Sequence, residues 1–164
     1  MSGAGPGTGL DVEVRRVTID DPLVEPLLRE LTEEYVRRYG PSAHSEMTRY
    51  PADSWTEPDG VLLILLEDGE PVAGGAYKRY DERTAEVKRM WTHSAHRRRG
   101  LARRVLVELE RAAAAVGYSR IFLTTGPLQP EAKELYLATG YTPQFDVGAD
   151  PLTIGPLPFE KDLR

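Results

Sequence analysis

Hydrophobic residues along the chain follow two spacings, one typical of helices and one typical of strands. In the helical segments an apolar residue recurs every three or four positions, and each segment ends at a glycine, a common stop signal. The run Val61–Leu66 is apolar throughout, which indicates a strand buried on both faces. The predicted elements are a strand at 12–17, a helix at 22–40, strands at 61–66, 71–80 and 85–92, a helix at 100–116, a strand at 120–125, a helix at 130–140, and strand-like pieces at 143–147 and 157–161.

The order of these elements predicts one α/β domain. Three consecutive strands joined to strand–helix–strand units favour a mixed sheet with helices on both faces. Residues 11–164 are therefore expected to form a single domain, and residues 1–10, rich in Gly, Ser and Pro, a flexible tail. Residues 41–60 predict an irregular segment with a short helix near 43–49. Gly74-Gly75 weakens its strand and predicts a bulge or a close approach by substrate, the bulge being favoured.

Composition excludes several functional classes. The 164 residues contain no cysteine, so no disulfide, Cys-ligated zinc, iron–sulfur cluster or cysteine nucleophile can form. The histidines are scattered without metal-ligand spacing, so no metal is expected. No apolar run approaches the roughly 20 residues of a membrane span, and no secretory signal is visible, which favours a cytoplasmic protein without a membrane partner. The net charge of −5 argues against a nucleic-acid partner.

One cluster of positive charge departs from this acidic average. Five arginines surround Gly100: Arg97, Arg98, Arg99, Arg103 and Arg104. The cluster lies where the strand at 85–92 leads into the next helix, and unpaired amides at a helix N-terminus attract anions. Gly100 lets the backbone approach an anion closely, and the small Ala102 leaves the first turn uncrowded. The segment therefore predicts a phosphate or pyrophosphate site, with a solvated basic helix start as the alternative.

The sequence Arg97-Arg-Arg-Gly-Leu-Ala102 matches the Arg/Gln-x-x-Gly-x-Gly/Ala motif of the GNAT-type N-acetyltransferases. The preceding strand resembles that family's fourth strand, and Ala132–Tyr141 resembles its Ala-x-x-Leu-Tyr-x-x-x-Gly-Phe segment. The resemblance covers roughly residues 61–141. It implies the GNAT-like acyl-CoA N-acyltransferase fold, with a mostly antiparallel sheet of six or seven strands, and acetyl-CoA as the donor.

The resemblance also implies which residues hold the donor. The backbone of the fourth strand would pair with the pantetheine arm where two strands splay apart, and the amides of the arginine motif would face the pyrophosphate. Gln129 stands where many members have an Asn that orients a water or contacts the cofactor. The implied cofactor-binding residues are Met90, Trp91, Thr92, Arg97, Arg98, Arg99, Gly100, Leu101, Ala102, Arg103 and Gln129.

Two residues are predicted to be catalytic. Tyr136 matches the family's tyrosine acid, which protonates the departing thiolate; a core aromatic is the alternative. Glu86 matches the strand glutamate that some members use as a base, and strict alternation would place it on the face of Lys88, Met90 and Thr92. Alternatively, Glu86 is an ion-paired strand residue. In that case a water chain or bulk solvent removes the proton from the amine. A backbone amide near Thr92 would polarise the thioester.

Together these residues predict an acetyl-CoA-dependent N-acetyltransferase acting on a primary amine of a small molecule or protein. Without cysteine no acyl-cysteine can form, so direct transfer in a ternary complex is expected. A non-catalytic acyl-CoA-binding or sensor domain on the same fold is the alternative. The acidic residues within 41–60 predict either a lip that attracts a cationic amine or a solvated loop. Family members often pair through their C-terminal strands, so the resemblance favours a homodimer.

Overall fold

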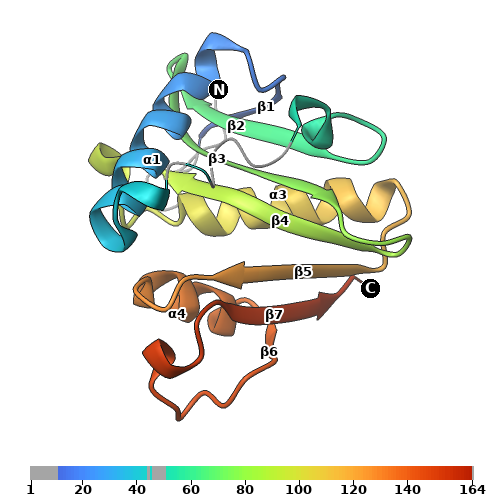
Figure 1. Cartoon of the computed structure of the whole chain (residues 1–164). Coiled ribbons are helices and arrows are strands. Elements are labelled where there is room, and N and C mark those ends of the chain that lie inside the picture. Colours follow the sequence, from blue (N-terminus) through green and yellow to red (C-terminus); the bar gives the residue numbers. More distant parts are fainter. Residues whose placement is uncertain (1–10, 44, 46–50, 164) are drawn as a thin grey trace.

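The computed structural model describes residues 11–43, 45 and 51–163, which form a seven-stranded sheet with helices on both faces (Figure 1). The strand order is β1-β2-β3-β4-β5-β7-β6, and every neighbouring pair is antiparallel except β4 with β5. The strands are β1 Glu13–Arg16, β2 Val61–Glu67, β3 Glu70–Arg79, β4 Thr84–Thr92, β5 Arg120–Thr125, β6 Thr142–Pro143 and β7 Leu157–Asp162. The predicted mixed, mostly antiparallel sheet is confirmed.

Helix α1, Glu25–Tyr39, covers one face of the sheet. The Asp21 carboxylate accepts a hydrogen bond from the Leu23 amide at 2.9 Å, which caps the short 3-10 turn before the helix. Gly40, with φ of 94°, ends α1 in a conformation that glycine adopts without strain. The predicted start and stop signals are therefore confirmed. The α1-side core consists of Val24, Leu27, Leu31, Trp55, Leu62, Ile64, Leu66, Ala76 and Trp91.

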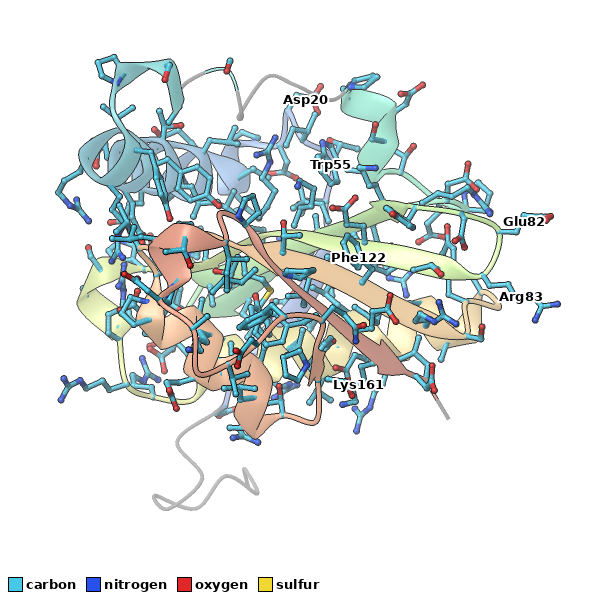
Figure 2. All side chains as sticks on the ribbon, turned by 60° about the horizontal axis from the view of Figure 1, so that its bottom comes forward. Asp20, Trp55, Glu82, Arg83, Phe122 and Lys161 are labelled. Carbon is cyan, nitrogen blue, oxygen red and sulfur yellow. The ribbon has the colours of Figure 1, made fainter. Side chains whose placement is uncertain are left out.

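Helices α3, Leu101–Ala115, and α4, Pro130–Ala138, contribute to a second core on the other face. Alternate residues of β2 face the two cores, which explains why its six apolar residues are all buried. Figure 2 shows Trp55 on the α1 side and Lys161 on the α3 side of the sheet. None of the helices in the described part of the chain is long and apolar enough to cross a membrane.

Three predicted segments differ from the structure or fall outside it. The piece predicted at 143–147 is reduced to β6, because the Asp146 side chain accepts from the Gly148 amide at 2.9 Å and closes a turn there. The tail at 1–10 and most of the helix predicted near 43–49 lie outside the described residues. A 3-10 turn at Pro41–Ala43 precedes that segment.

Strand β4 contains a β-bulge opposite the two glycines of β3. The register shifts by one residue between Gly74 and Ala76, and the extra residue belongs to β4. Arg89 of β4 has a φ of 62°, which is uncommon for a residue with a side chain. A Cβ on Gly75 would lie 2.8 Å from Met90 Sδ, so a glycine is needed beside the bulge. The predicted bulge is confirmed, but its extra residue lies on the partner strand.

This bulge makes the predicted alternation along β4 wrong. Glu86 and Lys88 share a face, with 3.7 Å between carboxylate and ammonium, and the neighbouring Val87 packs into the α3-side core. Met90 also packs against the α3-side core, whereas Trp91 belongs to the α1-side core. An extra residue inverts the parity of every residue that follows it. Met90 and Thr92 therefore do not share the face of Glu86.

Candidate active site

Strands β4 and β5 separate shortly after they meet. They pair only from Thr84–Arg120 to Glu86–Phe122, after which β5 continues beside β7. The His93 amide donates to the Val72 carbonyl on β3 at 2.9 Å. Because hydrogen bonding alternates along an antiparallel pair, the backbone groups of Trp91 also face β3, and those of Thr92 face the gap toward β5. The predicted splay is present, and Thr92 presents its backbone to it.

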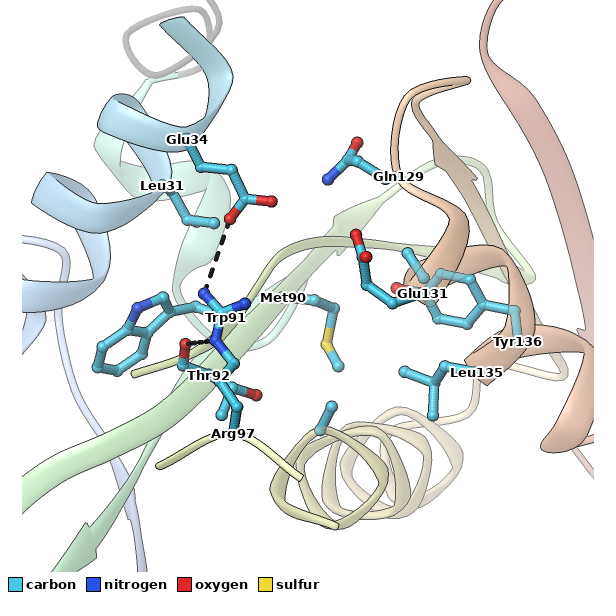
Figure 3. A pocket seen from close by; sticks show the side chains of 12 residues that line it. Leu31, Glu34, Met90, Trp91, Thr92, Arg97, Gln129, Glu131, Leu135 and Tyr136 are labelled. Carbon is cyan, nitrogen blue, oxygen red and sulfur yellow. Dashed lines mark hydrogen bonds and ion pairs between the residues drawn. The ribbon is translucent and has the colours of Figure 1, made fainter. Parts of the chain in front are cut away.

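A cavity of about 210 Å³ lies in this gap, between β4 and α4 (Figure 3). Leu31 and Glu34 reach it from α1, and Leu135 from α4. The sequence did not single out these three as site residues, although Leu31 and Glu34 lie one helical turn apart. The predicted site residues that line it are Met90, Trp91, Thr92, Arg97, Ala102, Gln129 and Tyr136.

The arginine motif lies at the start of α3. Gly100 is its N-cap with φ of 76°, and Arg98 has φ of 64°. The Arg104 amide makes the first helical hydrogen bond, to the Gly100 carbonyl at 3.1 Å, so the amides before it lie at the positive end of the helix dipole. Gly100 and Arg103 also line a depression of about 410 Å³ that includes Arg104 and Arg111.

The arginines of the motif have different contacts. The Arg97 guanidinium donates to the Thr92 carbonyl at 3.2 Å and lies 4.0 Å from Glu34 (Figure 3). Arg99 donates twice to Glu67 at the end of β2, at 3.0 and 2.5 Å. The Leu101 side chain is 1% exposed and belongs to the α3-side core, so only its backbone can face a ligand. The motif therefore combines residues that face the cavity with others that hold the loop.

The Glu67–Arg99 pair predicts a measurable effect on donor binding. Replacing Glu67 with Gln removes the charge that holds Arg99 and loosens the loop before Gly100. Because the pair is partly exposed, we expect the Kd for the donor that the sequence predicts, acetyl-CoA, to rise only about threefold, with no effect on the rate of the predicted transfer. Calorimetry would measure the Kd, and Glu13→Gln, which breaks the surface pair with Arg15, is the matched control. An unchanged Kd would remove this positioning role.

The Glu67–Arg99 pair should also make the stability of the fold depend on pH. The hydrogen bond from Arg99 holds the pKa of Glu67 below its ordinary value of 4.5. A lowered folded-state pKa stabilises the fold above the unfolded value, and this stabilisation is lost as pH falls through the folded value. The difference in Tm between the wild type and Glu67→Gln should therefore be constant above about pH 4.5 and shrink below it.

Glu30 of α1 fixes the end of β4. Its carboxylate accepts from Trp91 Nε1 at 2.9 Å, from the Ser94 amide at 3.0 Å and from the Ser94 hydroxyl at 2.8 Å. Burial alone would raise the pKa of Glu30, but these hydrogen bonds outweigh it and the pKa lies below its ordinary value. Glu30 therefore stays charged at neutral pH and ties α1 to the segment before the arginine motif. Its sequence position on the polar side of α1 did not indicate this role.

Tyr136 stands at the junction of two cavities. It lines the cavity between β4 and α4 and also a second one of about 520 Å³. The ring is 4% exposed and packs against Tyr141 and Phe159, each with 5.6 Å between ring centroids. Burial raises the pKa of the Tyr136 phenol above its ordinary value, so the group stays protonated at neutral pH. A buried phenol in this place can donate its proton to a leaving group.

The second cavity was not predicted from the sequence. Its walls come from α1, from β4 around the bulge, from the end of β5 and from α4. A pair of tyrosines one helical turn apart on α1 was the available signal, but such spacing is equally typical of core packing. The side chains that distinguish the cavity chemically are Tyr35, Tyr39, Lys88, Arg89, Thr124 and Thr125.

Two of the predicted site residues make contacts that stabilise the fold. Glu86 lies outside the lining of both cavities, with 3.4 Å to Lys78 Nζ and 3.7 Å to Lys88 Nζ. Gln129 lines both cavities, and its Oε1 accepts from the Gly126 amide at 3.0 Å and the Tyr39 hydroxyl at 3.4 Å. Gln129 therefore holds the β5–α4 loop against α1, while Glu86 is an ion-paired strand residue.

Comparison with known proteins identifies similar sequences. Residues 27–141 match the model of the Acetyltransferase (GNAT) family. The chain is 37% identical over 93 residues to the uncharacterized N-acetyltransferase YsnE of Bacillus subtilis, covering 53% of this chain and 62% of that protein. It is 32% identical over 117 residues to an IAA acetyltransferase of Azospirillum brasilense, covering 64% of this chain and 76% of that protein.

Solved structures share the fold. An acyl-CoA N-acyltransferase from Klebsiella pneumoniae superposes with a TM-score of 0.73 at 22% identity, covering 94% of this chain and 99% of that one. The PaiA N-acetyltransferase of Thermoplasma acidophilum in complex with coenzyme A gives a TM-score of 0.69 at 18% identity, covering 93% and 99%. At these identities the likeness establishes the fold alone.

Proposed function

The chain belongs to the acetyltransferase (GNAT) family, and on this premise we propose that it moves an acetyl group from acetyl-CoA directly to a primary amine. The observation that carries the proposal is the position of Tyr136. It is the one ionisable side chain of the described residues that lines both the cavity beside the arginine motif and the second cavity. The donor is assigned to the first cavity and the amine to the second.

The residues around the first cavity fit the donor. The amides before the first hydrogen bond of α3 and the exposed Arg98 and Arg103 suit a pyrophosphate. The backbone of Thr92, directed into the splay, suits an extended amide-bearing arm. Arg97, bonded to the Thr92 carbonyl, would have to share or release that contact. When bound, acetyl-CoA supplies the activated thioester.

The residues where the two cavities meet are suited to direct transfer of the acetyl group. The amine nitrogen forms a bond to the acetyl carbon, the carbon–sulfur bond breaks, and sulfur leaves as a thiolate. Tyr136 donates its phenol proton to that sulfur, which gives the free thiol, and water then returns a proton to the phenolate. A β4 amide near Thr92 stabilises the negative charge that develops on the carbonyl oxygen. Holding donor and amine in adjoining cavities supplies much of the rate.

Proton removal from the amine is assigned to water. Glu86 lies outside the lining of both cavities and is ion-paired with two lysines. A direct transfer from the amine to its carboxylate therefore lacks support. The residues that line the second cavity include Tyr35, Thr124 and Thr125, whose side chains carry hydroxyl groups that can hydrogen-bond a chain of waters.

Other expectations stay predictions. These are the cytoplasmic location, the homodimer, and the absence of metal, membrane and nucleic-acid partners. A non-catalytic acyl-CoA sensor on the same fold is the competing function. The buried, protonated Tyr136 at the junction favours the enzyme, because ligand sensing alone has no use for an acid.

Two measurements test the proposed function. Calorimetry with acetyl-CoA should show binding with a micromolar Kd, and a free-thiol assay across a panel of primary amines should show release of CoA with at least one of them. Binding without thiol release from any amine would favour the sensor. Absence of binding would contradict both functions.

A further inference from the structure

The residues that line both cavities mark the place where the cavities meet. Within the described part of the chain these are Met90, Gln129, Ala132 and Tyr136. With the donor in one cavity and the amine in the other, the acyl carbon that passes between them lies beside these residues. An acyl chain longer than acetyl would extend from the same carbon. The side chains that line both cavities are therefore the ones placed to limit its length.

Three of these side chains cannot vary the space around the acyl carbon. The Gln129 side chain is held to its own loop, because its Oε1 accepts from the Gly126 amide at 3.0 Å. The Ala132 side chain ends at Cβ. Tyr136 is buried, and its ring packs against two other aromatic rings. Met90 remains as the long, unbranched apolar side chain that lines both cavities, and methionine adapts readily to irregular spaces.

The β4 bulge determines where the Met90 side chain points. Without the extra residue at Arg89, strict alternation would place Met90 on the face of Glu86. With it, Met90 packs against the α3-side core. Figure 3 shows the Met90 side chain extending from β4 toward Leu135 of α4. Bulges next to active sites commonly redirect a side chain in this way. Here the bulge brings a thioether to the place where the cavities meet.

Gly75 of β3 provides the space that the Met90 thioether occupies. A Cβ on Gly75 would lie 2.8 Å from Met90 Sδ. The same Cβ would lie 2.9 Å from a methyl group of Val105 and 3.1 Å from one of Leu109, both on α3. Real Cβ atoms are not found at such distances, so the sulfur would have to move. Because α3 fills the space on that side, a displaced thioether would move toward the cavities.

The first cavity leaves little room for a longer acyl chain. Its volume of about 210 Å³ is below the roughly 300–1,000 Å³ of most pockets for small molecules. The second cavity is larger, at about 520 Å³, but a chain that extended into it would occupy the place of the amine. A single methylene in a closely fitting apolar pocket changes kcat/KM by roughly 10–200-fold. One side chain at this position can therefore decide which acyl groups are transferred.

We propose that Met90 sets the length of the acyl group. Its side chain forms the wall against which the acetyl methyl group packs, and longer acyl chains are excluded because they would collide with the thioether. The proposal rests on the proposed function, because that function places the acyl carbon where the two cavities meet. It assigns the Met90 side chain a role in specificity that is separate from any pairing of its backbone with the donor.

The test measures acyl-chain preference in the free-thiol assay. Acetyl-, propionyl- and butyryl-CoA are compared with the amine that gives the fastest release, since each donor yields the same CoA thiol. For the wild type we expect a kcat/KM at least about tenfold higher with acetyl-CoA than with butyryl-CoA. Met90→Ala should raise the butyryl-to-acetyl ratio at least about tenfold. The ratio compares two donors on one protein, so a general loss of activity cancels. A wild type without this preference, or an unchanged ratio in Met90→Ala, would overturn the proposal.

Leu135→Ala is the matched control. Leu135 is also a partly buried residue packed against the α3-side core, and this variant loses the same number of side-chain atoms as Met90→Ala. Leu135 lines the first cavity but not the second. Its butyryl-to-acetyl ratio should therefore stay within about twofold of the wild type. An equal rise in both variants would mean that the overall size of the first cavity, and not Met90, selects the acyl group.

Gly75→Ala should act in the opposite direction. The added Cβ displaces the Met90 thioether toward the cavities, so the propionyl-to-acetyl ratio should fall about threefold or more. Adding Met90→Ala to the same chain should abolish this effect, because no thioether is left to displace. Thermal unfolding shows whether each variant is folded, and an effect that persists in the double variant would contradict the proposal. If the wild type released no thiol from acetyl-CoA with any amine, the proposed function itself would fail together with this inference.

Discussion

Replacing Tyr136 with Phe is expected to lower kcat about 100-fold while leaving the Kd for acetyl-CoA within about twofold of the wild type. General acid catalysis contributes on the order of 10²–10⁴ to a rate, and the phenol is the protonated group at the junction of the two cavities. Its ring packs against Tyr141 and Phe159, and within the described part of the chain its hydroxyl makes no hydrogen bond, so the ring of Phe retains those contacts. Steady-state thiol release and calorimetry measure the two quantities.

Tyr141→Phe is the matched control. Tyr141 is buried in the same aromatic group, but its hydroxyl donates to Glu110 at 2.7 Å and it lines neither cavity. Losing that charge-assisted hydrogen bond should cost about 1–3 kcal/mol of folding stability and leave kcat unchanged. If Tyr136→Phe turned over as fast as the wild type, Tyr136 would have no part in proton transfer. If both variants lost kcat equally, the effect would come from packing.

The sequence predicts well those features that depend on local spacing. The apolar run Val61–Leu66 became β2, and Gly40 and Gly117 both adopt the positive φ angles expected just beyond a helix. The arginine motif lies at the start of α3 as predicted, because strand, loop and helix are contiguous in the chain. Each of these signals spans only a few residues, and no distant segment is needed to interpret it.

Features that depend on strand register were harder to predict from the sequence. A single extra residue at Arg89 inverts the rest of β4, and this separates Glu86 from the residues that line the first cavity. Gly75 hinted at the bulge but could not show which of the two strands carries the extra residue. The second cavity gathers side chains from α1, β4 and β5, so its lining depends on tertiary contacts that periodicity does not report. Glu67, the partner of Arg99, lies more than 30 residues earlier in the chain, and periodicity could not predict this pair for the same reason.

Replacing Gly100 with Val should raise the Kd for acetyl-CoA about 100-fold or more. Gly100 caps α3 at φ of 76°, where a side chain costs about 1–2 kcal/mol of strain. A branched side chain there would also stand among the amides proposed to face the pyrophosphate, and a loss of 2.7 kcal/mol corresponds to about 100-fold in affinity. Calorimetry measures the Kd, and thermal unfolding measures the accompanying loss of stability.

Gly117→Val separates the two contributions. Gly117 follows the other end of α3 with φ of 106°, and no atom lies within 4 Å of a Cβ built there, so Val meets backbone strain without crowding. We expect its Tm to fall at least as far as that of Gly100→Val, because its φ lies further from the left-handed minimum. Its Kd for acetyl-CoA should stay at the wild-type value. Equal loss of affinity in both variants would mean that α3 stability, rather than the loop at Gly100, governs donor binding. A selective loss in Gly100→Val would place the pyrophosphate at the start of α3.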